Sequence, residues 1–381
     1  MKKSLIALAV LGTFAGAAAA QSTATLYGKI DVGYGVSNNG AYELGGPHES
    51  KFQQFGNANS TSRWGLKGSE DLGNGLKAYF NLEQGFNPES GADKGGFDRA
   101  AFVGIAGNFG AIQAGRQTHV INNVLGQFDL SGSPNVTSAL GNAGISAISQ
   151  NANGGGLGTY SRVSSAIAYV SPNFSGFSFQ GAVVLKNDDI FGLDGVATGV
   201  TDIWGNPRLI ENKTIYTVGA QYNYGGFTIG AAYESKPADV PGVDISASWG
   251  IGAKYDFGSF VVSGGYFDNH FKSDGKGFYL GVKAPIGAFT VGAQIAYNTK
   301  AYNGTETNYV WFPNASTSSW DLYSYSGDRE VKPLAWELFA YYNLSKRTQL
   351  YLQYGGINND AEEYQGASRK YSANFGLIHN F

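Results

Sequence analysis

The chain has 381 residues, of which 56 are glycine and 14% are aromatic, whereas only 14% are charged and there is no cysteine. Soluble domains carry roughly 25% charged residues and about 7% glycine, so two ordinary soluble domains are disfavoured and an all-β chain with many tight turns is favoured. The lack of cysteine excludes disulfides, and a net charge of −3 without a concentrated basic patch argues against nucleic-acid binding.

The first twenty residues have the three parts of a secretory signal peptide. Lysines stand at positions 2 and 3, an apolar run follows at about 5–14, and small residues occupy positions 15–20. The apolar run is too short to span a bilayer of about 30 Å as a helix. We therefore expect residues 1–20 to be a signal peptide and residues 21–381 to be the mature chain, whose net charge would be −5.

Beyond residue 20 the dominant pattern is strict alternation of apolar with polar or tiny residues, which is typical of β-strands with two different faces. It is clear at 24–34, 245–256 and 289–298. A soluble sandwich also alternates, but its core would favour leucine and valine over amphipathic rings. Here the apolar faces carry rings of the kind found in the interfacial girdles of membrane barrels: Tyr34, Trp64, Tyr169, Tyr216, Tyr224, Tyr233, Tyr255, Trp336, Tyr342 and Tyr354.

Sixteen such segments follow one another, and their connections alternate between short turns and long loops. Bacterial outer-membrane barrels have an even number of strands, short periplasmic turns and longer outer loops, and closure leaves no unpaired edge in the membrane. The pattern therefore predicts one 16-stranded antiparallel transmembrane β-barrel that takes up the whole mature chain. The segments are centred near Leu26, Trp64, Tyr79, Phe102, Gln113, Ile167, Phe179, Val218, Ile229, Trp249, Val262, Leu280, Val291, Leu338, Leu352 and Phe375.

The longest connection, residues 116–160, is expected to fold into the barrel rather than over its mouth. Its interior is almost uncharged, and a position outside would expose many apolar side chains to water: Val124, Leu125, Phe128, Leu130, Val136, Leu140 and Ile145. This third long loop would narrow the channel.

The chain ends on a strand whose alternate residues are apolar or aromatic, and Phe381 is the last of them. A terminal aromatic residue in the lipid-facing register resembles the C-terminal signal that is read by the outer-membrane barrel assembly machinery. We therefore expect that machinery to be a partner through Phe381.

Several motifs resemble the general porins of β-proteobacteria and Neisseria. The most specific are the SRWGLKGSEDLG stretch at 62–73 and the SKRT turn at 345–348, and further matches occur at 25–28, 107–117 and 169–174. The resemblance covers the full length. It implies a 16-stranded barrel that forms a homotrimer, with the third loop folded inward.

Charged residues on the polar faces indicate where solutes would pass. Period two turns Arg63, Lys67, Glu83 and Arg162 toward the lumen, whereas the run after Arg99 is too uniformly apolar to orient that residue. In anion-selective members of the resembled family, basic residues matching Arg63, Arg99 and Arg162 cluster at the constriction. The basic side of the expected constriction consists of Arg63, Lys67, Arg99 and Arg162. Its acidic counterparts are Glu83 on the wall and Asp129 on the third loop.

The sequence therefore predicts an outer-membrane porin, a passive channel for small hydrophilic solutes and ions that prefers anions. Outer-membrane lipid and lipopolysaccharide would surround it, and no cofactor or metal site is expected.

An outer-membrane enzyme is an alternative of another class, although the four histidines lie far apart in sequence and there is no cysteine nucleophile. A substrate-specific sugar channel would tend toward eighteen strands and a ladder of lumenal aromatics. The loop at 299–332 leaves room for a second, adhesin-like role.

Overall fold

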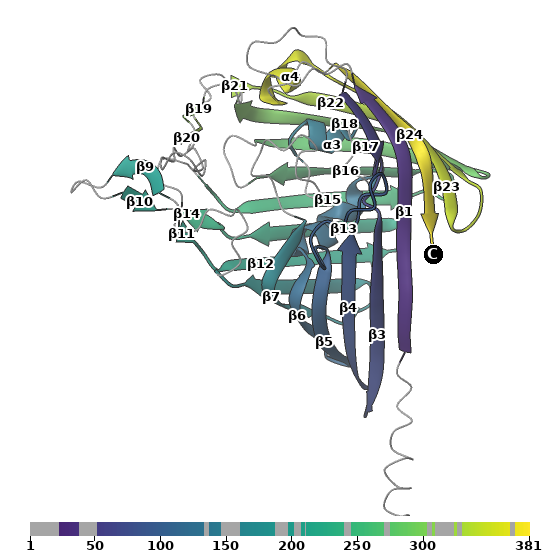
Figure 1. The fold of residues 1–381 in the computed structure, drawn as a ribbon, viewed down its shortest axis with the longest axis vertical. Helices are drawn as coiled ribbons and strands as arrows, with labels where there is room; N and C mark the ends of the chain where they lie inside the picture. Colours follow the sequence, from purple (N-terminus) through teal and green to yellow (C-terminus); the bar gives the residue numbers. More distant parts are fainter. Residues whose placement is uncertain are drawn as a thin grey trace, which may run out of the picture.

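The computed structural model describes residues 23–37, 52–132, 137–145, 161–186, 197–201, 207–209, 211–239, 245–269, 275–302, 307–308, 324–325, 330–365 and 370–381. The expected signal peptide at 1–20 lies outside this part of the chain. Consecutive barrel strands pair antiparallel all the way round, and the last strand pairs with the first, so that the sheet closes on itself (Figure 1). No helix in the described ranges is both long and apolar enough to cross a membrane.

Sixteen strands make up the barrel, and each of the sixteen expected centres falls inside one of them, which confirms the predicted fold class. The strands are β1 (Thr23–Ser37), β3 (Arg63–Gly73), β4 (Leu76–Gly85), β5 (Ala100–Gly107), β6 (Gly110–Thr118), β7 (Arg162–Val170), β8 (Phe177–Val184), β12 (Ile215–Tyr224), β13 (Phe227–Glu234), β15 (Ser248–Asp256), β16 (Val261–Asp268), β17 (Lys276–Ile286), β18 (Phe289–Tyr302), β22 (Leu334–Asn343), β23 (Thr348–Ile357) and β24 (Tyr371–Asn380).

Shorter elements stand on the long connections. The strand β2 (Phe52–Gly56) pairs back onto the end of β1, and β11 (Glu211–Asn212) pairs with β14 (Ala238–Asp239) above the β12–β13 hairpin. The remaining elements are β9 (Ala197–Thr201), β10 (Pro207–Leu209), β19 (Thr307–Asn308), β20 (Ser324–Tyr325), β21 (Glu330–Val331), α2 (Val120–Leu125), η1 (Gly126–Phe128), α3 (Ala139–Asn142) and α4 (Asn359–Gln365).

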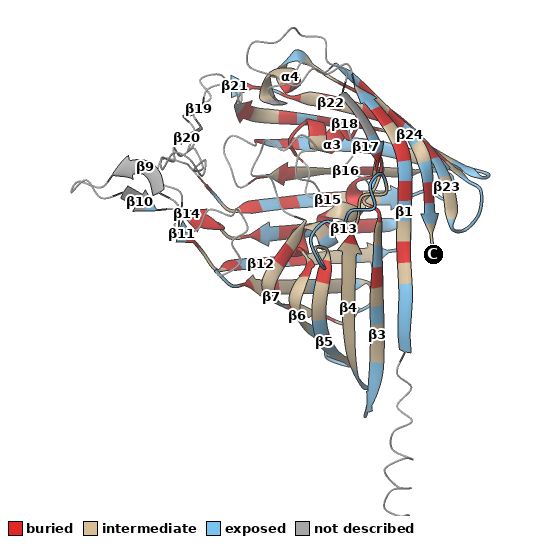
Figure 2. Cartoon of the chain, in the orientation of Figure 1, coloured by how far each residue is buried: buried red, intermediate tan, exposed pale blue. Residues whose placement is uncertain are grey.

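The barrel is apolar outside and polar inside, the reverse of a soluble protein. Leu26, Val103 and Leu280 are each about 60% exposed on the outer face, whereas Gln353 and Asn374 are completely buried on the inner face. Figure 2 shows the exposed short-turn ends of β1 and β3 and the buried residues around α3. This inversion is what a wall between lipid and a polar lumen requires.

Closure of the barrel brings the C-terminal residue onto the first strand. The backbone N–H and C=O of Phe381 both bond to Gly28, at 3.0 Å each, and the Phe381 ring covers the glycine so closely that a Cβ there would lie 2.2 Å from Cζ. Thus the terminal aromatic residue completes the outer wall, and Gly28 provides the space for its ring.

The third loop folds inside the barrel, as its composition predicted, for the residues described between 116 and 145. The helix α2 and the turn η1 pack on β12, β13 and β15, and α3 packs on β18, β22 and β23. The inward glycines of β12, β13 and β15 make this approach possible. A Cβ on Gly219 would lie 2.8 Å from Val124, and one on Gly252 would lie 2.4 Å from Phe128. Val136 and residues 146–160 lie outside the described part of the chain.

Candidate functional site

The cross-strand register sets basic side chains in a row on one side of the lumen. Lys29 on β1 stands opposite Arg63 on β3, Gly65 stands opposite Glu83 on β4, and Glu83 stands opposite the first residue of β5. Arg99 directly precedes β5, and Arg162 opens β7. Adjacent strands therefore bring together side chains that are up to 133 positions apart in sequence.

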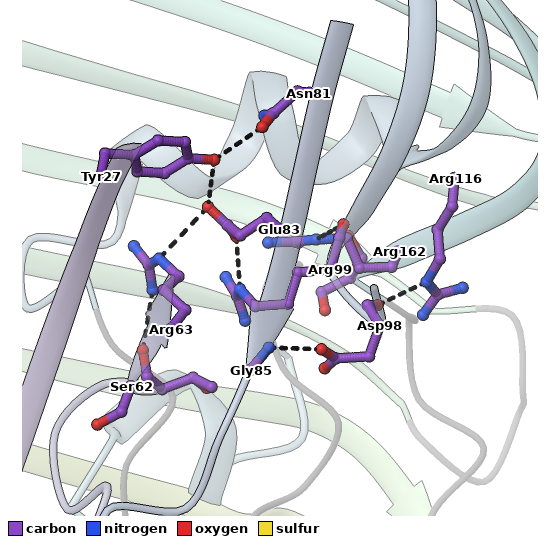
Figure 3. Close-up of polar contacts among 12 residues, drawn as sticks. Tyr27, Ser62, Arg63, Asn81, Glu83, Gly85, Asp98, Arg99, Arg116 and Arg162 are labelled. Atoms are coloured by element: carbon purple, nitrogen blue, oxygen red, sulfur yellow. Dashed lines mark hydrogen bonds and ion pairs between the residues drawn. The ribbon is translucent and has the colours of Figure 1, made fainter. Parts of the chain in front are cut away.

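Glu83 is the carboxylate at the centre of this basic cluster (Figure 3). Arg99 donates from Nε to Glu83 Oε1 at 2.6 Å, and Arg63 Nε lies 3.7 Å from Oε2. Tyr27 donates from its hydroxyl to the same Oε2 at 2.9 Å. The side chains of Arg63, Glu83 and Arg99 are 24%, 13% and 17% exposed, so each is held in place by the wall while part of it still reaches the lumen.

Arg162 and Arg116 extend the cluster along β6 and β7. Arg162 donates from Nε to the carbonyl of Arg99 at 3.0 Å, and Arg116 donates to the carbonyl of Asp98 at 2.5 Å and to Ser164 Oγ at 2.7 Å. The partners are neutral carbonyl and hydroxyl oxygens, so within the described residues neither guanidinium group forms an ion pair. Figure 3 shows the four arginines facing the same space.

Lys67 lies at the edge of the cluster, toward the short-turn end of β3. Its Nζ stands 4.9 Å from the centre of the Tyr27 ring, a distance suited to a cation–π contact. The structure thus brings five of the six expected site residues into one region: Arg63, Lys67, Glu83, Arg99 and Arg162.

Asp129 is the exception: it lies on the third loop, as expected, but its side chain is directed away from the arginines. Its Oδ1 accepts from Gln294 Nε2 at 2.8 Å and from both the N–H and the hydroxyl of Ser131 at about 3 Å, and the residue is buried. It therefore anchors the third loop to β18 on the other side of the lumen. Burial raises the pKa of its carboxyl above the ordinary range. Period two carries no information about an irregular loop, so the sequence could not give the direction of this side chain.

Two basic residues of the cluster were missed, for different reasons. Lys29 lies two residues after Tyr27 and therefore on the same side of the first strand. The alternation of inward and outward residues could have identified it if it had been applied to that strand. Arg116 lies at a bulge, where the β6–β7 register shifts between Gly115 and Gln117. Simple alternation therefore does not give the direction of its side chain. Gly115 has φ +125°, and a Cβ there would lie 2.2 Å from the carbonyl oxygen of Ala101, so only glycine fits this bulge.

Chemically, the cluster can attract and pass anions. Four guanidinium groups face the lumen around one carboxylate, and Arg keeps its charge at any working pH. Within the described residues, no group of three histidine, cysteine or acidic side chains is arranged to hold a metal ion.

Comparison with known proteins identifies the family. The sequence model of the Gram-negative porins matches residues 7–362, so the chain belongs to the Gram-negative porin family. It is 33% identical over 257 residues to an outer membrane porin protein of Bordetella pertussis, covering 62% of this chain and 60% of that one. It is also 34% identical over 248 residues to outer membrane porin protein 32 of Delftia acidovorans, covering 59% of this chain and 67% of the relative.

The fold is similar to that of solved porins. An anion-selective porin from Comamonas acidovorans superposes with a TM-score of 0.67 over 95% of this chain and all of that one, at 23% identity. Family membership, together with the closed barrel and its apolar outer face, makes the chain a β-barrel of the bacterial outer membrane, as the sequence predicted.

Proposed function

We propose that the chain is a passive diffusion channel for small hydrophilic solutes and ions, narrowed between the basic cluster and the third loop, and that it prefers anions. The observation that carries the proposal is the set of four arginines on the wall: Arg63, Arg99, Arg116 and Arg162. Rings of Arg and Lys select anions in pores. The solved porin of similar fold that is named anion-selective supports the same interpretation.

The negative charge of the whole chain does not oppose this preference. Acidic residues such as Glu330, Asp360 and Glu362 stand on outer connections. Exposed charges more than a Debye length of about 8 Å away are largely screened at physiological salt. An anion at the narrowest point therefore interacts mainly with the basic cluster. The carboxylate of Asp129 is buried and accepts a hydrogen bond from Gln294 on β18.

The test is a planar-bilayer measurement on the mature chain. In a tenfold KCl gradient, the reversal potential should have the sign that chloride permeation gives. A cation sign would refute the anion preference, and a failure to form channels would refute the diffusion function itself. Family membership favours a channel over the outer-membrane enzyme that the sequence left open.

We further propose that residues 1–20 are removed on export and that the mature barrel assembles as a homotrimer through the outer face of β1–β5. A hollow of about 250 Å³ on this face has the small side chains Ala24 and Ala78 in its lining, beside larger ones such as Phe80, and would suit close packing of a neighbour. Gly28 does not contribute to such a surface, because the Phe381 ring covers it.

Intact mass and unboiled detergent gels test these two points. The mature protein should lack the first twenty residues and should run as a heat-dissociable oligomer; a monomer in native mass spectrometry would refute the trimer. The barrel assembly machinery, through Phe381, and lipopolysaccharide in the surrounding membrane complete the proposed partners.

A further inference from the structure

Three aromatic side chains lie on the lumen wall beside the basic cluster. Glu83, Asn81 and Tyr79 are successive inward residues of β4, and Phe102 on β5 stands opposite Asn81. Successive inward rows along a strand are two residues, or about 7 Å, apart. The rings therefore extend from the arginines toward the short-turn end of the barrel. We call Tyr27, Tyr79 and Phe102 the aromatic strip.

Two of these rings lie along the wall instead of pointing across the channel. Tyr27 covers Gly65 of β3, where a Cβ would lie 2.7 Å from the Cζ atom of the ring. Tyr79 covers Gly104 of β5 in the same way, with a Cβ to Cζ distance of 2.6 Å. Only glycine leaves room for a ring at either position. Because both tyrosines are half-buried, each has one face against the backbone and the other toward the lumen.

The hydroxyl groups of both tyrosines are bound to the wall. The Tyr27 hydroxyl donates to Asn81 Oδ1 and Glu83 Oε2, at 2.9 Å from each, and the Tyr79 hydroxyl donates to Gln113 Oε1 at 2.9 Å (Figure 3 shows the Tyr27 contacts). The part of each ring that reaches the lumen is therefore carbon. Water over such a surface is readily displaced by a flat apolar group.

Phe102 and Tyr79 together form a corner. Their ring centroids are 6.2 Å apart, and the ring planes stand at 80° to each other. The neighbouring Val103 is 61% exposed on the outer face, so Phe102 faces inward. Since Tyr79 lies along the wall, Phe102 rises from it, and a third ring can stack on one of them and meet the other edge-on. Aromatic rings favour both arrangements, at centroid distances of about 4.5–7 Å.

Positive charge stands directly beside this corner. Lys67 on β3 stands opposite Asn81, whose other neighbour is Phe102, and the Lys67 Nζ atom lies 4.9 Å from the centre of the Tyr27 ring. The arginines lie one row further toward the long loops, around Glu83. In the two rows that contain the corner, the described strands β1 to β6 contribute no carboxylate. A solute with a flat ring and an anionic end therefore meets a complementary surface.

We propose that the aromatic strip is a binding site for aromatic carboxylates of the benzoate type, with the ring at the Tyr79–Phe102 corner and the carboxylate at Lys67 and the arginines. This inference rests on the proposed anion-preferring channel and names a class of solute for it. Apolar contact on one side of an open lumen holds such a solute only weakly. Conduction requires that weakness, because a bound solute must also leave.

Blockade of single-channel KCl current by sodium benzoate, measured at pH 7 in planar bilayers with the purified mature protein, tests the site. Cyclohexanecarboxylate is the matched probe, since it has the same charge and a ring of the same size that is not aromatic. Benzoate should half-block the current at a concentration lower by roughly two- to tenfold, the factor that an aromatic pair contributes beyond its buried area. Benzyl alcohol, which lacks the charge, should block less than benzoate.

The variants assign this difference to the strip. Tyr79→Leu with Phe102→Leu should make benzoate and cyclohexanecarboxylate equally poor blockers. Tyr79→Phe keeps the ring without its hydroxyl and should behave as the wild type does, as should Phe278→Leu on the outer face of β17. Phe102→Leu alone leaves Tyr79 on Gly104 and provides a milder variant if the double substitution folds poorly; it should lose part of the difference.

Equal blockade of the wild type by benzoate and cyclohexanecarboxylate would overturn the proposal, as would a double variant that still distinguishes them. Blockade by benzyl alcohol at the same concentration as benzoate would overturn the role of the cations. The KCl conductance and reversal potential of each protein without any blocker report the channel and its anion preference independently, so a failure of the proposed function is recognised separately.

Discussion

The two sides of the lumen obey the same period-two pattern but are built from opposite kinds of residue. Strands β1 to β7 present long cationic side chains, among them Arg63 and Arg162, that are held by carbonyls and one glutamate. Strands β12 to β15 present glycines, and the third loop lies directly on them. One side thus carries the arginines that a solute meets, and the other, where Lys254 on β15 also contacts the loop, sets the space that is left for it.

Because separate residues carry these two properties, charge and width should be separable by mutation. A change on the arginine side should alter selectivity with little effect on the position of the loop. A change on the glycine side should alter conductance while the sign of selectivity is kept. The variants below test this division, beginning with the largest expected effect.

Reversing two charges on the arginine side should reverse the selectivity. Arg63→Glu with Arg162→Glu replaces two cations by two anions at the lumen wall, where rings of charge set the ion preference of a pore. In a tenfold KCl gradient the reversal potential should change from the anion sign to the cation sign. Lys213→Glu with Lys236→Glu makes the same change in net charge on the exposed rim and should leave the sign unaltered. Reversal by the rim variant would show that selectivity is not local.

Adding bulk on the glycine side should narrow or shift the passage. Gly252→Val forces the Phe128 ring to move, since the new Cβ would lie 2.4 Å from Cδ2. Such overpacking typically costs about 1–3 kcal/mol, and displacement of η1 toward the lumen should lower single-channel conductance. Phe128→Ala in the same chain should restore much of it. Gly181→Val on the outer face is the control and should conduct normally; an unaffected Gly252→Val would mean that the loop does not limit flow.

Much of this organisation could be predicted, because a barrel wall repeats one simple rule. Alternation indicated the number and centres of the strands and the inward direction of Arg63, Lys67, Glu83 and Arg162. Arg99 was included only through resemblance, as it stands one residue before β5, where alternation has not yet begun.

Where the rule breaks, sequence reasoning failed. The bulge at Gly115 hid the direction of Arg116, and the irregular backbone of the third loop left the direction of the Asp129 side chain undetermined. The short helices α2 and α3 were also not predicted, because they depend on packing against distant strands rather than on local propensity; α2, for example, lies on the inward glycines Gly219 and Gly250. Composition nonetheless indicated that the loop needed shelter from water.

Removing the one carboxylate at the arginine centre should strengthen the anion preference. Glu83→Gln keeps an acceptor for Tyr27 but removes the charge that pairs with Arg99 and Arg63. One unit charge at about 4 Å in water is worth roughly 1 kcal/mol, so the reversal potential should move further in the anion direction without a change of sign. Glu70→Gln, at the exposed short-turn end of β3, should have no measurable effect. A shift toward cations would contradict the position of Glu83 in the permeation path.

The smallest effect is expected at the loop anchor, and it concerns stability rather than flow. Burial raises the pKa of Asp129, so between its unfolded and folded pKa values the native state binds more protons than the unfolded state. Its contribution to stability is therefore fully present at low pH and declines as pH rises through the folded pKa.

Asp129→Asn keeps an oxygen to accept from Gln294 and Ser131 and removes the buried charge. The variant should be more stable than the wild type at pH 8, because the wild-type protein must either bury a charged carboxylate or keep it protonated against the solution pH. The advantage should shrink toward pH 4. Heat-induced unfolding followed by tryptophan fluorescence at both pH values measures this, with Glu70→Gln at the exposed short-turn end of β3 as the control. A variant that is less stable at pH 8 would show that the ionised carboxylate itself holds the loop to the wall.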